Sequence, residues 1–192
     1  VRNISLVKKQ IQSLDKSWKD IDVLINNAGN AHGKKQLSKG SIKDWDAMID
    51  SNVKGLLYVS KTIIPNMISR KSGHIINISS IAGKETYESG VVYCASKKAV
   101  ESISKGMRLE LTKHDIKVSN IAPGAVETEF SEIRFKGNKE KASLVYKDYS
   151  PLIAEDISDL ISYILSCPDR VTIADITILP KKQSSATIIH KN

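Results

Sequence analysis

The feature that most constrains the fold is an alternation of helical and strand-like segments along the chain. Apolar residues spaced three or four apart predict amphipathic helices, and short continuous apolar runs predict buried strands. Because strands separated by helices form right-handed crossovers, they build a parallel sheet. The sequence therefore predicts an α/β fold with a doubly wound parallel sheet. Helices are expected over residues 4–18, 42–68 (kinked at Pro65), 93–113, 139–146 and 155–166, and strands over 21–25, 74–78, 116–121 and 174–179.

The composition narrows the class of protein. A length of 192 residues predicts one domain, with an irregular segment at about 125–150 and a polar tail at 181–192. The excess of 29 Lys and Arg over 21 Asp and Glu gives a net charge of +8, but the two signs interleave, which favours a solvated basic surface over a nucleic-acid site. No apolar run approaches the roughly 20 residues of a membrane span. The two cysteines lack metal-ligand spacing, so we expect no metal, and they are too few for a disulfide framework, which fits a reducing compartment. Together with the absence of a long apolar run, this predicts a cytoplasmic protein without a membrane partner.

The sharpest chemical signal is Tyr93 followed by Lys97 on a predicted helix. Residues four apart share a helix face, so the phenol and the ammonium point into the same space. A positive charge about 4 Å away, at an effective dielectric near 20, is worth on the order of 4 kcal/mol, or roughly three pKa units. We expect Lys97 to lower the pKa of Tyr93 toward neutrality, against the opposing effect of burial, and so to make a general acid/base pair. The pair by itself also fits an ordinary surface contact.

Further polar residues follow the predicted strands. Residues 26–29 (Asn-Asn-Ala-Gly) end the first strand, Ser80 lies just after the second, and Pro123-Gly124 ends the third. Asn52 lies inside a predicted helix. Asparagine is a poor helix former, so at such a position it is either exposed or has a side chain with a functional role. Since ligands of such folds bind beyond the carboxyl ends of the strands, we expect these residues to face one crevice.

Together these motifs, in this order and spacing, resemble the short-chain dehydrogenase/reductase family, which has a Rossmann-type fold. The resemblance implies that Tyr93 exchanges a proton with the substrate oxygen while hydride passes to or from the nicotinamide. It implies that Lys97 lowers the phenol pKa and binds the nicotinamide ribose, and that Ser80 holds the substrate oxygen. Asn52 would anchor a proton-relaying water. The same resemblance assigns cofactor binding to Asn26, Ala28, Gly29, Tyr93, Lys97, Pro123, Gly124, Val126 and Thr128.

A narrower resemblance covers residues 121–131, 134–138 and 145–148, which look like the NADP-dependent 3-hydroxy acid dehydrogenases. It implies NADP as the cofactor, although the residues themselves allow NAD as well, and substrates such as serine, allo-threonine or 3-hydroxyisobutyrate. The segment at about 125–150 would be the substrate lobe. A carboxylate substrate favours a bidentate cation, and Arg134 is our candidate, the alternative being that Arg134 pairs with Glu129, Glu132 or solvent.

The first part of the family fold is not found in this sequence. No Gly-rich pyrophosphate-binding turn precedes Asn26, so we expect an N-terminally truncated chain that lacks the first strands. The strand at 23–25 would then expose an apolar edge, which predicts poor folding, weak cofactor binding and no useful activity of residues 1–192 alone. An assay of both this chain and one extended upstream tests that expectation.

Three readings stay open at this point. The first is hydride transfer to or from a 3-hydroxy acid. The second is a carbonyl reductase for another small or lipophilic ketone, and the third is an inactive truncated family member. The resemblance also implies a homotetramer built through the helices at 42–69 and 93–113. The tail from Lys181 is either an arm that docks on a neighbour or a frayed terminus.

Overall fold

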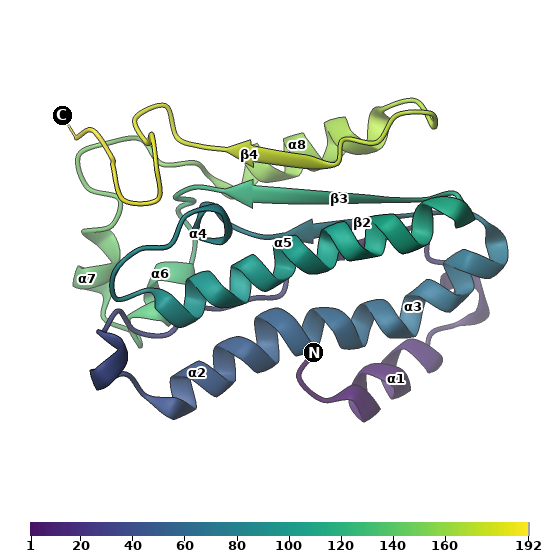
Figure 1. Ribbon diagram of the computed structural model, residues 1–192, viewed down its shortest axis with the longest axis horizontal. Coiled ribbons are helices and arrows are strands. Elements are labelled where there is room, and N and C mark those ends of the chain that lie inside the picture. Colours follow the sequence, from purple (N-terminus) through teal and green to yellow (C-terminus); the bar gives the residue numbers. More distant parts are fainter. Residues whose placement is uncertain (192) are drawn as a thin grey trace.

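The computed structural model describes residues 1–191 and contains one parallel sheet (Figure 1). Its four strands lie in the order β1-β2-β3-β4, and all three strand pairs are parallel. The strand bounds are β1 Val23–Asn26, β2 Gly73–Ile78, β3 Ile116–Pro123 and β4 Asp175–Ile178. The predicted α/β class with a parallel, Rossmann-type sheet is therefore confirmed, and each expected strand is present.

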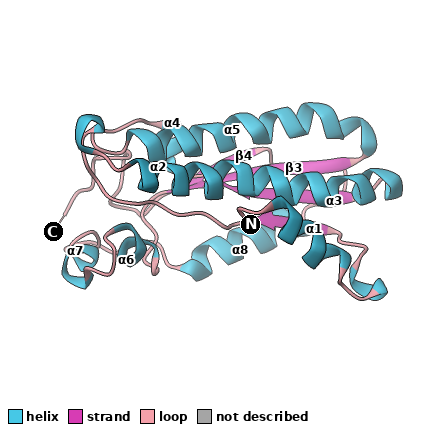
Figure 2. Ribbon diagram, turned by 90° about the horizontal axis from the view of Figure 1, so that it is seen from below, coloured by secondary structure: helices cyan, strands magenta, loops and turns pink. Residues whose placement is uncertain are grey.

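Helices cover both faces of the sheet, as Figure 2 shows. On one face lie α3 (Leu56–Arg70) and α5 (Val91–Leu111), whose apolar stripes bury Ile75 and Val118 in one core cluster. On the other face α8 (Ala154–Ser166) places Ile164 against Ile76 and Ile121 in a second cluster. Each strand thus buries alternate residues on opposite sides, which explains why the central strands are continuously apolar rather than alternating.

A row of asparagines crosses the face under α3 and α5. Asn26, Asn77 and Asn120 are partners in register on β1, β2 and β3, and all are buried. Asn26 donates to the side-chain oxygen of Asn77 at 2.8 Å, and Asn77 donates to the Ser104 hydroxyl of α5 at 2.9 Å. Because buried amides are costly without partners, these bonds allow a polar row inside the core and tie the sheet to α5.

Strand β1 lies at the edge of the sheet. Its Ile25 points to the face covered by α8, but the cluster under α8 draws on β2, β3 and β4 only. Ile25 is consequently 43% exposed, although it sits in the middle of an apolar strand. The described chain therefore presents an apolar edge at β1, which is the exposure that the sequence predicted there.

Two helix predictions need correction. The helix expected over 4–18 ends early, since α1 covers Ile4–Gln12 and only a 3₁₀ turn, Lys16–Trp18, follows. Trp18 is 71% exposed, so no packing holds a helix at that end. The helix expected over 42–68 is divided into α2 (Ile42–Ile49), a π-helical segment (Asp50–Gly55) and α3, so its irregularity lies before Leu56 rather than at Pro65, which α3 contains.

The segments expected to be irregular contain short helices. These are α4 (Ile81–Lys84) and α6 (Phe130–Arg134), together with a 3₁₀ turn at Leu37–Lys39. The short helix expected over 139–146 is present as α7 (Lys139–Ser143), and the helix expected over 93–113 is α5, which is followed by a 3₁₀ turn at Thr112–His114. Helices of four or five residues are too short to show an apolar period, which is why the sequence pattern did not predict α4 and α6.

Candidate active site

The loops after β1, β2 and β3 meet at one edge of the sheet, as predicted. Ser80 follows β2 and caps α4 by accepting a hydrogen bond from the Ala82 amide at 3.1 Å. Its hydroxyl also lies beside the phenol of Tyr93, in the first turn of α5, and acts to lower the pKa of that phenol. The structure therefore brings Ser80 and Tyr93 together, 13 positions apart in the sequence, through the packing of α4 against α5.

The phenol of Tyr93 is buried, and its environment differs from the expected one. Burial raises the pKa of Tyr93 well above its ordinary value, and the Ser80 hydroxyl and the charge of Arg134 oppose that rise. The expectation that Lys97 dominates and lowers this pKa is thus wrong for this structure. The physical reason is that withdrawal of the phenol from water penalises the phenolate more than the neighbouring groups stabilise it.

Lys97 lies one turn beyond Tyr93 and is only 6% exposed. Its amine donates to the Ile78 carbonyl oxygen at 3.0 Å, at the carboxyl end of β2. Burial lowers the pKa of Lys97 to about 8, which leaves the ammonium form dominant at neutral pH. A Cβ atom on Gly29 would lie 3.3 Å from this nitrogen, so the loop after β1 passes directly over the ammonium.

Asn52 occupies the π-helical segment and is 2% exposed. Its side-chain oxygen accepts from the Asn30 amide at 2.8 Å, and its nitrogen donates to the Asn30 carbonyl at 2.9 Å and to the Ser96 hydroxyl at 2.9 Å. Ser96 in turn donates to the Tyr93 carbonyl at 2.7 Å. Asn52 thus fastens the loop after β1 to the first turns of α5, and π-helical turns are frequent at functional sites.

The residues expected to bind the cofactor fall into two groups. Ala28 and Gly29 are exposed on the loop after β1, and Gly124, Val126 and Thr128 lie on the loop after β3. Asn26 differs from both groups. Its side-chain nitrogen donates to the Ser60 hydroxyl at 3.0 Å and to the Asn77 side-chain oxygen, so it belongs to the buried row of asparagines. The structure therefore places the Asn26 side chain in the core beneath the loop and not on its exposed surface.

Arg134 of α6 lies over the ring of Tyr93, with 5.4 Å between its guanidinium carbon and the ring centroid. It donates to the Tyr87 hydroxyl at 3.0 Å, and among the described residues no carboxylate pairs with it. Pairing with Glu129 or Glu132, which the sequence left open, is therefore not observed. Tyr87 itself carried no signal in the sequence, since only the packing of α6 against the loop before α5 brings it to the site.

A cavity of about 380 Å³ opens beside Tyr93 and Arg134. Lysines dominate its charged lining, and Asp44, which pairs with Lys136 at 2.9 Å, is its one carboxylate among the described residues. Within residues 1–191, no cluster of His, Cys, Asp and Glu could hold a metal ion, and no helix is long and apolar enough to cross a membrane. The cavity's cationic lining is Lys34, Lys35, Arg134, Lys136 and Lys141.

Comparison with known proteins gives consistent matches. Residues 1–139 match the short chain dehydrogenase family. The NADP-dependent 3-hydroxy acid dehydrogenase YdfG of Salmonella typhi is 41% identical over 194 residues, covering 100% of this chain and 78% of that protein. The NADP-dependent 3-hydroxy acid dehydrogenase of Schizosaccharomyces pombe is 39% identical over 191 residues, covering 100% of this chain and 74% of that protein.

Solved structures agree with these matches. The closed form of a serine dehydrogenase complexed with NADP⁺ superposes with a TM-score of 0.95 at 39% identity, covering 100% of this chain and 78% of that one. Serine dehydrogenase from Escherichia coli superposes with a TM-score of 0.82 at 34% identity, covering 95% of this chain and 74% of that one.

Proposed function

The chain belongs to the short-chain dehydrogenase family and is an oxidoreductase, and on this basis we propose that it transfers a hydride between NADP and a short 3-hydroxy acid such as serine, allo-threonine or 3-hydroxyisobutyrate. The single observation that carries the proposal is the buried phenol of Tyr93, which lies beside the Ser80 hydroxyl and under the guanidinium of Arg134. This arrangement offers one proton donor, one hydroxyl and one cation to the same small molecule.

The residues around the loop after β1 fit a nicotinamide cofactor. Gly29 has no side chain above Lys97 and Asn52, and any Cβ there would crowd both, at 3.3 and 3.2 Å. The backbone of an exposed loop is therefore free to approach a ligand while the ammonium lies just behind it. Ala28, Gly29, Lys97 and the loop after β3 would hold the cofactor, which when bound supplies or accepts the hydride.

The proton chemistry follows from the pKa of Tyr93. The raised pKa of Tyr93 keeps the phenol protonated, so that it can donate to the developing alkoxide when a ketone is reduced. The phenolate that remains is stabilised by the Ser80 hydroxyl and by the charge of Arg134. In the reverse direction, Tyr93 must first lose its own proton, and the resulting phenolate then accepts the proton of the substrate hydroxyl, while Ser80 holds the same oxygen in place.

Arg134 supports a carboxylate-bearing substrate. Its guanidinium lies beside the Tyr93 ring with a hydroxyl, not a carboxylate, as its side-chain partner, so its charge stays available. The adjoining cavity adds several lysines, which raise the local concentration of anions. A guanidinium can engage a carboxylate through two parallel hydrogen bonds, and this would fix the hydroxyl carbon relative to Tyr93.

The test is NADP reduction by L-serine or 3-hydroxyisobutyrate, using the protein with any residues encoded upstream of Val1. Tyr93→Phe should abolish turnover but keep cofactor binding, whereas Tyr163→Phe, on an exposed tyrosine of α8, should behave as wild type.

Arg134→Gln should raise the KM for hydroxy acids, because it removes the cation proposed to bind their carboxylate. Arg170→Gln, at an exposed arginine, is its control. If wild type instead prefers ketones without a carboxylate, and Arg134→Gln leaves the KM for hydroxy acids unchanged, the enzyme is a carbonyl reductase for another small or lipophilic ketone. Absence of both binding and turnover would identify an inactive family member.

We also propose a cytoplasmic homo-oligomer, with a tetramer as the expected size. Support for an interface comes from exposed apolar side chains on the two long helices, Leu57 of α3 (41% exposed) and Leu109 of α5 (77%). Support for a reducing compartment comes from Cys94 and Cys167, which are both free. Light scattering of wild type and Leu109→Lys tests the interface, because an added charge there should shift the mass toward smaller species.

A further inference from the structure

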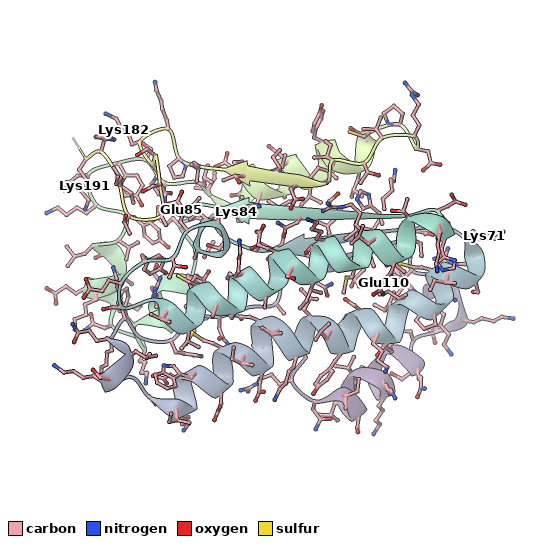
Figure 3. All side chains as sticks on the ribbon, in the orientation of Figure 1. Lys71, Lys84, Glu85, Glu110, Lys182 and Lys191 are labelled. Carbon is pink, nitrogen blue, oxygen red and sulfur yellow. The ribbon has the colours of Figure 1, made fainter. Side chains whose placement is uncertain are left out.

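The chain does not fray after β4 but turns back over the site. We call residues 181–190 the C-terminal strap. The Ser184 amide donates to the Ile188 carbonyl at 3.0 Å and the His190 amide to the Lys182 carbonyl at 2.8 Å, so the strap is a closed hairpin. In Figure 1 it is the yellow loop at the carboxyl end of the strands, and Figure 3 places Lys182 and Lys191 at the same end of the molecule as Glu85. The possible docking arm thus packs on its own chain.

Gln183 is the anchor of the strap, and it is only 7% exposed. Its side-chain oxygen accepts from the Ala125 amide at 2.8 Å, and its nitrogen donates to the Ser185 carbonyl at 2.9 Å. A Cβ atom on Gly124 would lie 2.3 Å from the Gln183 oxygen, so this oxygen lies directly against the Gly124 backbone. A buried side-chain amide whose oxygen and nitrogen are both hydrogen-bonded restrains the backbone that it contacts. Breaking either bond would leave an unpaired polar group inside the protein, which costs free energy.

The strap also reaches the loop on the substrate side. The Ala186 amide donates to the Glu85 carboxylate at 2.8 Å. Glu85 directly follows α4, the short helix that Ser80 caps, and stands two residues before Tyr87, the partner of Arg134. One hairpin therefore touches the loop after β3 through Gln183 and the segment between Ser80 and Tyr87 through Ala186.

From these contacts we infer that the C-terminal strap is a part of the active site and that Gln183 is a positioning residue for the loop Pro123–Val126. The inference rests on the proposed function, since this loop matters to catalysis only where the nicotinamide lies against it. Gln183 touches neither substrate nor cofactor. It acts by holding the Ala125 amide, and thereby the Gly124 backbone, in one conformation before a ligand arrives, which removes an ordering cost from binding.

Three variants test the inference. Gln183→Met removes both hydrogen bonds at similar volume, Gln183→Glu keeps an acceptor oxygen for Ala125, and Gln12→Met replaces an exposed glutamine of α1 as the control. For Gln183→Met we expect the KM and Kd for NADP to rise roughly three- to tenfold, as loss of one buried hydrogen bond implies, with a smaller change in kcat. Gln183→Glu should lie closer to wild type, and amide exchange of the 124–127 peptide should be faster in Gln183→Met alone.

The outcomes separate the strap from the proposed function. If Gln183→Met lowers only the thermal midpoint and leaves the KM and Kd for NADP unchanged in the folded protein, Gln183 is merely structural and the inference is overturned. The same holds if peptide 124–127 exchanges as in wild type. If wild type turns over no hydroxy acid and binds no NADP, the proposed function fails and the inference falls with it. Normal wild-type turnover with unaffected Gln183→Met overturns the inference alone.

Discussion

Acidification should destabilise this fold through His74, a buried histidine of β2. His74 is 5% exposed, and its Nε2 atom lies 2.8 Å from the Ser119 hydroxyl of the neighbouring strand. Burial, assisted by the charge of Lys117, lowers the pKa of His74 from 6.5 to about 4. The folded state therefore resists a proton that the unfolded state accepts readily.

The sign and size follow from linkage. Above pH 6.5 the ring is neutral in both states, and the stabilisation is fully present. As pH falls from 6.5 to 4, the unfolded chain binds a proton that the folded chain excludes, so the free energy of unfolding decreases. The difference of about 2.5 units corresponds to roughly 3 kcal/mol, a large part of a typical domain stability of about 5–15 kcal/mol.

The assay is urea unfolding at pH 7, 6, 5 and 4.5 of wild type and His74→Gln, which keeps an amide for Ser119 but does not titrate. Because both proteins share every carboxylate, the difference between their unfolding free energies isolates His74. Between pH 7 and 5 we expect the unfolding free energy of wild type to fall by about 1–2 kcal/mol more than that of His74→Gln. This follows from linkage, which gives about 1.4 kcal/mol per pH unit where the unfolded state binds one proton more than the folded state. His190→Gln, on an exposed histidine, is the control. A wild-type-minus-variant difference that is flat across this range would refute the reasoning.

Three further predictions concern the site and helix α5. The kcat/KM for cofactor in the reductive direction should fall as pH rises through about 8, where Lys97 loses its proton, and Lys97→Arg should lack this step in a pH–rate profile. Gly90→Ala should destabilise the folded protein by about 1–3 kcal/mol in urea unfolding, because the added Cβ would lie 2.0 Å from the Tyr87 ring. Gly106→Ala is the contrasting variant: the Cβ would enter open space on α5, and alanine is the better helix former, so the folded protein should gain about 0.5–1 kcal/mol. Asn52→Ala, which loses three hydrogen bonds, should cost about 1–3 kcal/mol and lower kcat, as thermal and steady-state assays will show.

Much of the site was predictable because its residues are tied to local patterns. Ser80 and Gly124 follow apolar strands, and the carboxyl ends of parallel strands meet at one edge of a sheet. Tyr93 and Lys97 share one helix turn. Such statements need only the period of a helix or strand and the rule of parallel topology, so the sequence carries them. The helix boundaries at Gln12 and Asp50 were harder, since they depend on what the segment packs against.

The alternation of apolar segments determined the parallel α/β sheet. The motifs at 26–29, Asn52, Ser80, Tyr93 with Lys97, and 123–124 were sufficient for the resemblance to the family, which the comparisons confirm. Tertiary structure alone decided that Asn26 turns into the core, that Arg134 rests on Tyr87 and Tyr93, and that Gln183 holds the loop after β3. It also decided the direction of the Tyr93 pKa, which depends on burial. The physical reason is the distance in sequence over which each property is set. The apolar period depends only on neighbours within one helix or strand. Burial, local charge and hydrogen-bond partners depend on segments that are far apart in the sequence.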